Sequence, residues 1–155
     1  MTRTDEFAKD MCKMLKSSWP ELEWKCAWSP GAGYEHVDLV GRLKRRKLIF
    51  IEVELRRYAP VVNVIKMWKW MDAHTLEMKP IVVQAFSGFY SKGDSRRTSA
   101  EFIGFKMAKE HRVTYISLGF SYKPRKYGKV GAGRRRIHAR QLATTISRKL
   151  QQGSH

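Results

Sequence analysis

The segment LIFIEVEL, residues 48–55, limits the choice of fold more than any other stretch of the chain. A nearly continuous run of Leu, Ile, Phe and Val is typical of a strand that is buried on both faces of a sheet. The run nevertheless carries two acidic residues, Glu52 and Glu54, near its end. Because buried charges are costly unless they are paired or bind a cation, these two acids need a specific explanation.

The remaining apolar patterns predict that helices and strands alternate along the chain. Further strands are expected over 22–28, 34–43, 80–86 and 113–120. Helices are expected over 5–17, 61–78, 99–109 and a final stretch that ends near Leu150. This order predicts an α/β fold in which helices flank a mixed central sheet. The 155 residues fit one domain over 1–150, and the tail over 151–155 ends in GSH, which resembles a cloning remnant.

Two helices carry more detailed predictions. Thr98 and Glu101 have the T-x-x-E spacing of a capping box, so a helix is expected to begin there. The helix after Pro60 is expected to run for about five turns. Its predicted apolar face consists of Val61, Val62, Ile65, Trp68 and Met71, and the opposite side consists of Asn63, Lys66, Trp70 and His74.

The composition indicates an anionic partner. The chain has 31 Lys and Arg residues against 14 Asp and Glu, which gives a formal net charge of +17. Charge of this size opposes compaction, and nucleic acid is the partner that it most often serves. No apolar run approaches the ~20 residues that span a bilayer, so no membrane-spanning segment is expected. The two cysteines, Cys12 and Cys26, form no zinc-binding or disulfide pattern, which favours a reducing, cytoplasmic location.

The basic residues gather in three segments. One is the KRRK turn of a predicted hairpin, the second follows the strand over 80–86, and the third is a Gly-rich segment, 121–140, that leads into the final helix. Arginine pairs with phosphate and glycine lets the backbone approach it, although each segment could also be a solvated loop. The predicted nucleic-acid contacts are Arg45, Arg46, Arg96, Arg97, Lys123, Arg125, Lys126, Lys129, Arg134, Arg135 and Arg136.

The carboxylates of the buried strand suggest a metal site. Alternate residues of a strand share a face, so Glu52 and Glu54 point the same way. A short hairpin joins this strand to the preceding one, and antiparallel pairing can bring Asp38 beside Glu52. Converging carboxylates repel one another unless a cation neutralises them, and oxygen ligands favour Mg²⁺ or Mn²⁺. The alternative is that these acids form ion pairs with basic residues such as Arg56 or Arg57.

From about residue 4 to residue 118, this arrangement resembles the PD-(D/E)XK nuclease superfamily. Thirteen residues separate Asp38 of HVDLV from Glu52 of EVE. The resemblance implies a restriction-endonuclease-like αβββαβ core, Mg²⁺-dependent hydrolysis of DNA, and Asp38 and Glu52 as metal ligands. It also implies an acid from the first helix, with Glu6 the nearest match and Asp10 the alternative. Compact relatives often pair to cut two strands, so the resemblance is compatible with a homodimer.

Two departures from the family pattern concern the chemistry. Val37 stands where a Pro is usual, and Glu54 stands where a Lys is usual. Glu54 is expected to act either as a further metal ligand or in activating water, and some restriction enzymes of the superfamily are active with a Glu there. Alternatively, Lys66 or Lys69 from the next helix supplies the missing lysine, although a lysine is by default exposed. Gln84 is expected either to contact the substrate or to be a hydrogen-bonded core amide.

The expected function is therefore a Mg²⁺-dependent DNA endonuclease that needs no small-molecule cofactor. The alternative is a non-catalytic protein that binds DNA or RNA through the same basic residues, with EVE as an ion-paired strand end. A peripheral membrane protein is less consistent with the sequence, because no predicted helix has a strongly basic polar face.

Overall fold

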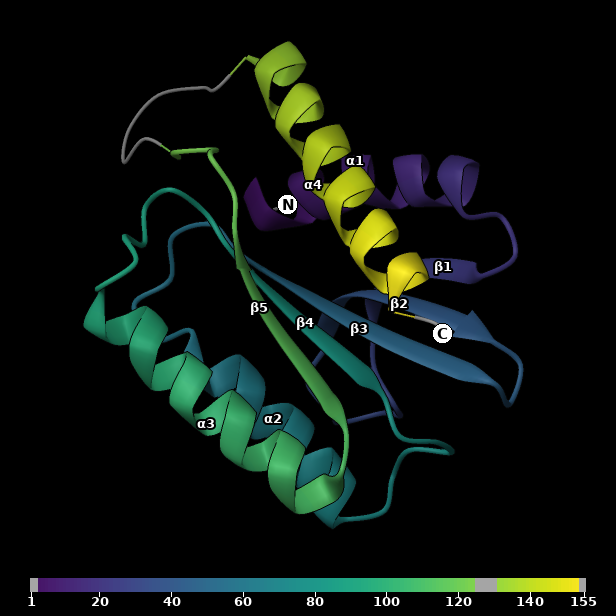
Figure 1. Ribbon diagram of the computed structural model, residues 1–155. Helices are drawn as coiled ribbons and strands as arrows, with labels where there is room; N and C mark the ends of the chain where they lie inside the picture. Colours follow the sequence, from purple (N-terminus) through teal and green to yellow (C-terminus); the bar gives the residue numbers. More distant parts are fainter. Residues whose placement is uncertain (1–2, 125–130, 154–155) are drawn as a thin grey trace.

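The computed structural model describes residues 3–124 and 131–153, which form five strands and four helices (Figure 1). The strands are β1 (Glu23–Trp28), β2 (Val37–Leu43), β3 (Lys47–Glu54), β4 (Ile81–Phe86) and β5 (Thr114–Gly119). The helices are α1 (Arg3–Ser18), α2 (Val61–Asp72), α3 (Ser95–His111) and α4 (Ala132–Gln152). The predicted order of elements is confirmed.

The strands form one mixed sheet in the order β1-β2-β3-β4-β5. The first three strands pair antiparallel through short connections, and β3, β4 and β5 pair parallel to one another through the crossover helices α2 and α3. β3 therefore lies in the middle of the sheet. The parallel register places Glu52 beside Gln84 and Glu54 beside Phe86, so the carboxyl ends of β3 and β4 lie together.

The helices cover both faces of the sheet, as Figure 1 shows. α1 and α4 pack together on one face, and α2 and α3 pack on the other. β3 serves both layers, because Ile49, Ile51 and Val53 belong to the first core and Leu48 and Phe50 to the second. Residues 48–54 are all buried, which confirms the two-sided burial that the apolar run predicted. The protein thus has an α/β fold, in which a five-stranded mixed sheet lies between two layers of helices.

Two helix boundaries differ from the sequence prediction. α2 ends at Asp72 rather than near residue 78, because His74 adopts a left-handed φ of 54° and its N–H bonds to Met71 O. α3 begins at Ser95, where Asp94 is the N-cap and accepts a hydrogen bond from Arg96 N at 2.9 Å. The capping box predicted at Thr98 is therefore wrong, since Thr98 lies inside the helix.

The predicted apolar face of α2 is wrong in part, because Met71 is buried as expected but two of the five residues assigned to this face are exposed. Val62 and Ile65 are 56% and 44% exposed, whereas Asn63, Lys66 and Trp70 are buried against the sheet. The reason lies in β3, whose two buried carboxylates face this helix. A hydrogen-bond partner for a buried carboxylate stabilises the fold more than a further apolar contact at the same place would. Polar residues therefore occupy the side of α2 that faces the sheet.

No helix in residues 3–124 and 131–153 is long and apolar enough to cross a membrane. α4 runs to Gln152, two residues past the expected end of the domain.

Candidate functional site

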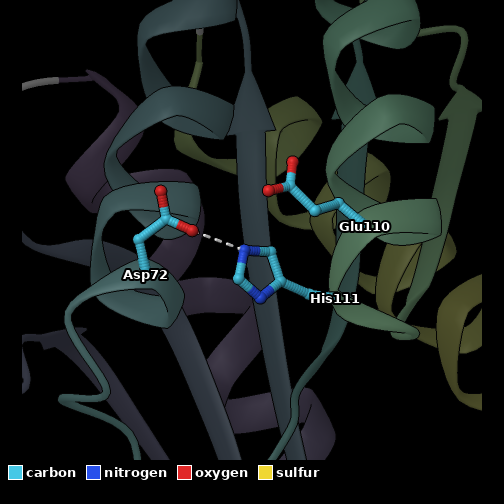
Figure 2. Close-up of side chains that lie close together, drawn as sticks. All are labelled: Asp72, Glu110 and His111. Carbon is cyan, nitrogen blue, oxygen red and sulfur yellow. Dashed lines mark hydrogen bonds and ion pairs between the residues drawn. The ribbon is translucent and has the colours of Figure 1, made fainter.

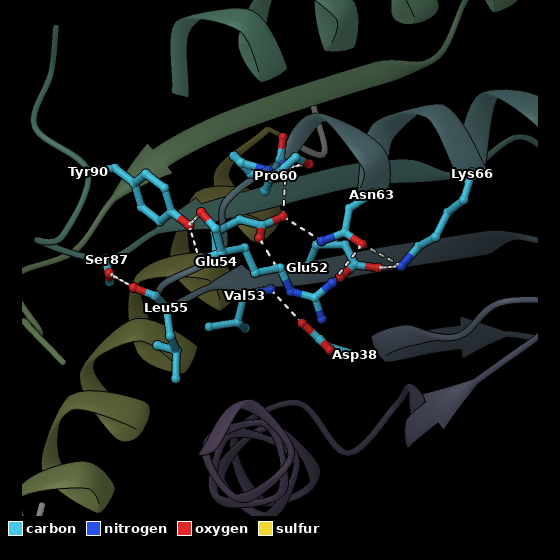
Figure 3. A network of polar contacts seen from close by, with 12 residues as sticks. Asp38, Glu52, Val53, Glu54, Leu55, Pro60, Asn63, Lys66, Ser87 and Tyr90 are labelled. Atoms are coloured by element: carbon cyan, nitrogen blue, oxygen red, sulfur yellow. Dashed lines mark hydrogen bonds and ion pairs between the residues drawn. The ribbon is translucent and has the colours of Figure 1, made fainter. Parts of the chain in front are cut away.

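The polar residues of the buried strand form a connected network at its carboxyl end, shown in Figure 3. Glu52 and Glu54 are both 0% exposed on β3. The β2 strand supplies Asp38, and the first turns of α2 supply Asn63 and Lys66. Side chains of this polarity are rarely buried unless each is paired or has a function, so the contacts of each carboxylate are described in turn.

Asp38 lies beside β3 as the hairpin predicted. The last paired residues of the β2–β3 ladder are Leu39 and Ile51. Beyond this pair, the Asp38 carboxylate accepts the N–H of Val53 at 2.8 Å in place of a backbone partner. This bond holds Asp38 against the strand that carries Glu52.

Glu52 forms an ion pair with Lys66, whose side chain is itself buried and only 7% exposed. The Lys66 ammonium also donates to His36 O at 2.5 Å and to Asn63 Oδ1 at 3.0 Å. The default expectation of an exposed lysine is therefore wrong for Lys66. It holds for Lys69, which is exposed and lies 3.7 Å from Glu35. α2 thus brings one lysine, and not the other, to the carboxylates.

Glu54 is held by two amides. Its Oε1 accepts from Asn63 Nδ2 at 2.7 Å and from Gln84 Nε2 at 2.8 Å. Gln84 also donates to Pro60 O at 3.0 Å and accepts from the Tyr115 hydroxyl at 2.6 Å. Both N–H donors of the Gln84 amide and one acceptor site of its oxygen are used inside the protein. Gln84 therefore positions Glu54. Of the two alternatives, a substrate contact or a hydrogen-bonded core amide, its contacts match the core amide.

The electrostatics of the site oppose full ionisation. Burial raises the pKa of Glu52 well above its usual range, and the neighbouring Asp38 charge raises it further, while Lys66 lowers it in part. Burial likewise raises the pKa of Asp38 against the hydrogen bond from Val53. Burial raises the pKa of Glu54, although the hydrogen bonds from its two amide donors lower it in part. Lys66 and Arg57 supply two positive charges beside three carboxylates, so the site favours either a proton or a further cation.

The free oxygens of the site fit a hard divalent cation. Oε2 of Glu52 and Oε2 of Glu54 are buried and have no hydrogen-bond partner among the described residues. Asp38 lines a neighbouring cavity of about 570 Å³ together with Asp5, Lys9 and Arg57. Mg²⁺ is commonly held by one or two carboxylates, with water and phosphate as its other ligands. The donor set Asp38 and Glu52 matches this requirement, whereas Asp38, Glu52 and Glu54 do not place one ligand atom each within 4.8 Å of one another.

The predicted acid from α1 is not brought to these carboxylates. Glu6 and Asp10 both bind Arg135 of α4, at 2.8 Å from Arg135 Nη1 and Nε respectively. This triplet lines a different cavity from that of Asp38. The acidic α1 residue that lines the Asp38 cavity is Asp5, one position before Glu6 in the sequence.

The predicted nucleic-acid contacts are spread over several surfaces. Arg45 and Arg46 are exposed in the β2–β3 turn, at the far end of β3 from Glu52. Arg96 pairs with Asp94 at 2.6 Å and Arg97 with Glu101 at 2.9 Å. In the Gly-rich segment, Lys123 is exposed. On α4, Arg134 and Arg136 are exposed, whereas Arg135 is half-buried. Arg125, Lys126 and Lys129 lie outside the described residues.

A second group of metal-ligand side chains lies at the other end of α2 and α3. Asp72, Glu110 and His111 place one ligand atom each within 4.8 Å of one another, the only such trio among the described residues (Figure 2). His111 Nε2 lies 2.7 Å from Asp72 Oδ1. Asp72 and Glu110 are exposed, and an exposed acid–histidine pair of this kind is common without a metal. The group is useful as a control for the buried site.

Sequence interpretation missed two residues of the site. The apolar pattern places Asn63 on the outward side of α2, although its spacing with Lys66 marks one polar stripe on the helix. Tyr115 anchors Gln84 from β5, and nothing in its strand pattern distinguishes it, so only the tertiary fold identifies it. Arg57, which the sequence offered as an ion-pair partner of these acids, lines the Asp38 cavity, and its Nε lies 3.9 Å from Glu54 Oε2.

The raised pKa of Glu54 predicts a specific pH dependence of stability. Because folding raises this pKa above its ordinary 4.5, the folded state holds the proton more tightly than the unfolded chain does. The stabilisation that comes from the protonated Glu54 of the folded state is complete below pH 4.5, and it is lost as pH rises through the folded-state pKa of Glu54. We expect the free energy of unfolding of the wild type to fall relative to that of Glu54→Gln as pH rises, measured by urea denaturation in EDTA. A constant difference would contradict the raised pKa.

Comparison with protein-family models gives no match to the chain, and comparison with curated proteins gives none either. The function must therefore be inferred from the site itself.

Proposed function

We propose that this protein is a Mg²⁺- or Mn²⁺-dependent DNA endonuclease with a restriction-endonuclease-like αβββαβ core of the PD-(D/E)XK type. The observation that carries the proposal is the cluster of Glu52 and Glu54, buried with Lys66 at the carboxyl end of the central strand, and the half-buried Asp38 beside them. An isolated strand end has no need for two buried acids with a third next to them, because each buried charge raises the cost of folding. In a chain of net charge +17, the substrate of such a site is a polyanion.

Each residue of the site would have a separate role in phosphodiester hydrolysis. Asp38 and Glu52 would hold the metal, which when bound supplies charge stabilisation and a more acidic water. Glu54 accepts protons at its free Oε2, and the Asn63 and Gln84 amides fix its orientation. Lys66 holds a positive charge beside Glu52, where negative charge develops on a phosphate in the transition state. Arg57 faces the same cavity and can pair with a phosphate.

The buried position of Lys66 also supports the family assignment. Glu54 stands where the usual lysine would be, and an ammonium from α2 contacts the preceding carboxylate instead. The charge that the family pattern lacks in the strand is thus present in space. This placement favours the migrated lysine over the interpretation in which the pattern has lost its lysine altogether.

One observation favours the alternative, a non-catalytic nucleic-acid-binding protein. Lys66 pairs with Glu52, and the amides of Asn63 and Gln84 bind Glu54, so much of the network is satisfied inside the protein. In that case the acids serve the fold, and a metal adds nothing to them.

A paired cleavage and stability measurement separates the two functions. With Mg²⁺, we expect the protein to cut at least one of supercoiled, linear, single-stranded and branched DNA, and we expect no cutting in EDTA. Millimolar Mg²⁺ should also raise the melting temperature, because the ion binds the folded state alone, and Glu52→Gln should abolish this rise. A melting temperature that Mg²⁺ leaves unchanged, together with intact DNA in every reaction, would favour the non-catalytic protein. The homodimer and the cytoplasmic location stay predictions.

A further inference from the structure

Two loops beside the carboxylate site carry arginine and aromatic side chains together. The β3–α2 loop contributes Arg56, Arg57 and Tyr58, the connection from β4 into α3 contributes Phe89, and the first turn of α3 contributes Arg96. These five residues are called the arginine–aromatic surface below. Both loops follow the carboxyl ends of parallel strands, at the edge of the sheet where Glu54 lies.

Two guanidinium groups contact the Phe89 ring. The Cζ atoms of Arg56 and Arg96 are each 4.7 Å from the centre of this ring. Asp94 compensates the charge of Arg96, whereas Arg56 has no carboxylate partner within residues 3–124 and 131–153. An anion bound beside Arg56 would compensate this remaining charge. Phosphate is the anion that suits paired guanidinium groups.

Tyr58 is presented to solvent by a loop that is firmly held. Its side chain is 91% exposed, more than that of any other large apolar residue described. The loop beneath it is fixed by the Tyr90 hydroxyl, which accepts the N–H of Arg57 and donates to Arg57 O at 2.6 Å. Ser87 adds bonds to Glu54 O at 2.9 Å and to Leu55 O. A single exposed aromatic residue is common on protein surfaces. An exposed tyrosine on a held loop near three arginines, however, has the composition of a surface on which a nucleic-acid base can stack.

The surface leads directly into the carboxylate site. Arg57 belongs to both, because its Nε lies 3.9 Å from Glu54 Oε2 and its side chain lines the cavity that contains Asp38. A DNA strand whose phosphates bind the arginines can therefore extend toward the carboxylates.

We propose that the arginine–aromatic surface binds DNA with unpaired bases, so that the substrate carries a single-stranded segment next to the phosphodiester that is cut. In a duplex the bases are stacked within the helix, and a tyrosine on the phosphate side cannot reach their faces. In a single strand the phosphates bind Arg56, Arg57 and Arg96 while one base stacks on Tyr58. This inference rests on the proposed DNA-binding function and specifies its substrate class.

The test measures binding without catalysis, by fluorescence anisotropy in EDTA. The three labelled ligands are a single strand, a blunt duplex and a fork in which a duplex carries a single-stranded arm. For Tyr58→Ala we expect affinity for the single strand and the fork to fall about tenfold, the scale of one lost base–aromatic stack, and affinity for the duplex to stay within about twofold. Tyr58→Phe should bind all three ligands as the wild type does, because the ring is retained.

Phe102→Ala is the matched control, since Phe102 is 60% exposed on α3 and lies outside the arginine–aromatic surface. It should change none of the three affinities. Equal weakening by Tyr58→Ala on all three ligands, or no weakening on any, would overturn the inference. If the wild type itself binds none of the ligands, the DNA-binding function fails as well. If it binds and cuts DNA but Tyr58→Ala behaves as the wild type, only the single-strand inference fails.

Discussion

Asp38→Asn and Glu52→Gln should each lower DNA cleavage in Mg²⁺ by at least about a thousandfold, the upper end of what one electrostatic contact to a transition state contributes. Both changes keep the size of the side chain while they remove a carboxylate from the buried cluster. DNA binding in EDTA should stay intact, and it can tighten slightly because a negative charge near phosphate is removed. Rates under single-turnover conditions and anisotropy measure the two effects separately.

Asp72→Asn is the control for this pair. Asp72 belongs to the exposed trio with Glu110 and His111, so its loss tests whether the active metal lies there instead. We expect wild-type cleavage from Asp72→Asn. Loss of cleavage in Asp72→Asn with full activity in Glu52→Gln would move the active site to the far ends of α2 and α3 and contradict the assignment of the buried carboxylates.

Lys66→Met is expected to reduce the cleavage rate about a hundredfold or more while DNA affinity changes little. The ammonium contacts Glu52, and in the proposed nuclease a charge at this position would act on the reacting phosphate rather than on distant parts of the substrate. The same change removes one partner of a buried ion pair, which costs about 3–5 kcal/mol when the other charge is left alone. We therefore expect a lower melting temperature in EDTA that Mg²⁺ partly restores.

Lys69→Met separates this effect from a general loss of charge on α2. Lys69 is exposed three residues further on and pairs with Glu35 at the surface, where such pairs contribute little. Its loss should leave cleavage and melting temperature near wild-type values. Equal rates for Lys66→Met and the wild type in Mg²⁺, with only stability reduced, would make Lys66 a structural counter-ion.

The sheet could be predicted from sequence because its signals are local. The apolar run over 48–55 identified a strand with two buried faces, and the KRRK turn fixed the antiparallel pairing that places Asp38 near Val53. The helix ends were less predictable. Asp94 and Thr98 both suit a cap, and only the tertiary position of α3 decides that Asp94 is used. A hydrogen-bonding residue near a boundary is therefore an ambiguous signal.

The site was only partly predictable for a related reason. The acids Asp38, Glu52 and Glu54 are visible as a spacing along two strands, because the pleat fixes which side chains share a face. Their partners depend on which side of α2 meets the sheet. Hydrophobicity places Val62 and Ile65 inside, whereas the buried carboxylates require Asn63 and Lys66 there. An apolar pattern cannot reveal this choice, because it follows from charges on a different element.

The internal position of Lys66 has a consequence for how the protein is made. Small metal domains whose only counter-charge is the ion unfold without it, so their biosynthesis depends on metal supply. Here the positive charge beside Glu52 is part of the chain and is present as soon as α2 packs on β3. The polypeptide can thus reach its final shape without an ion, and the proposed metal would bind afterwards, in a separate and reversible step.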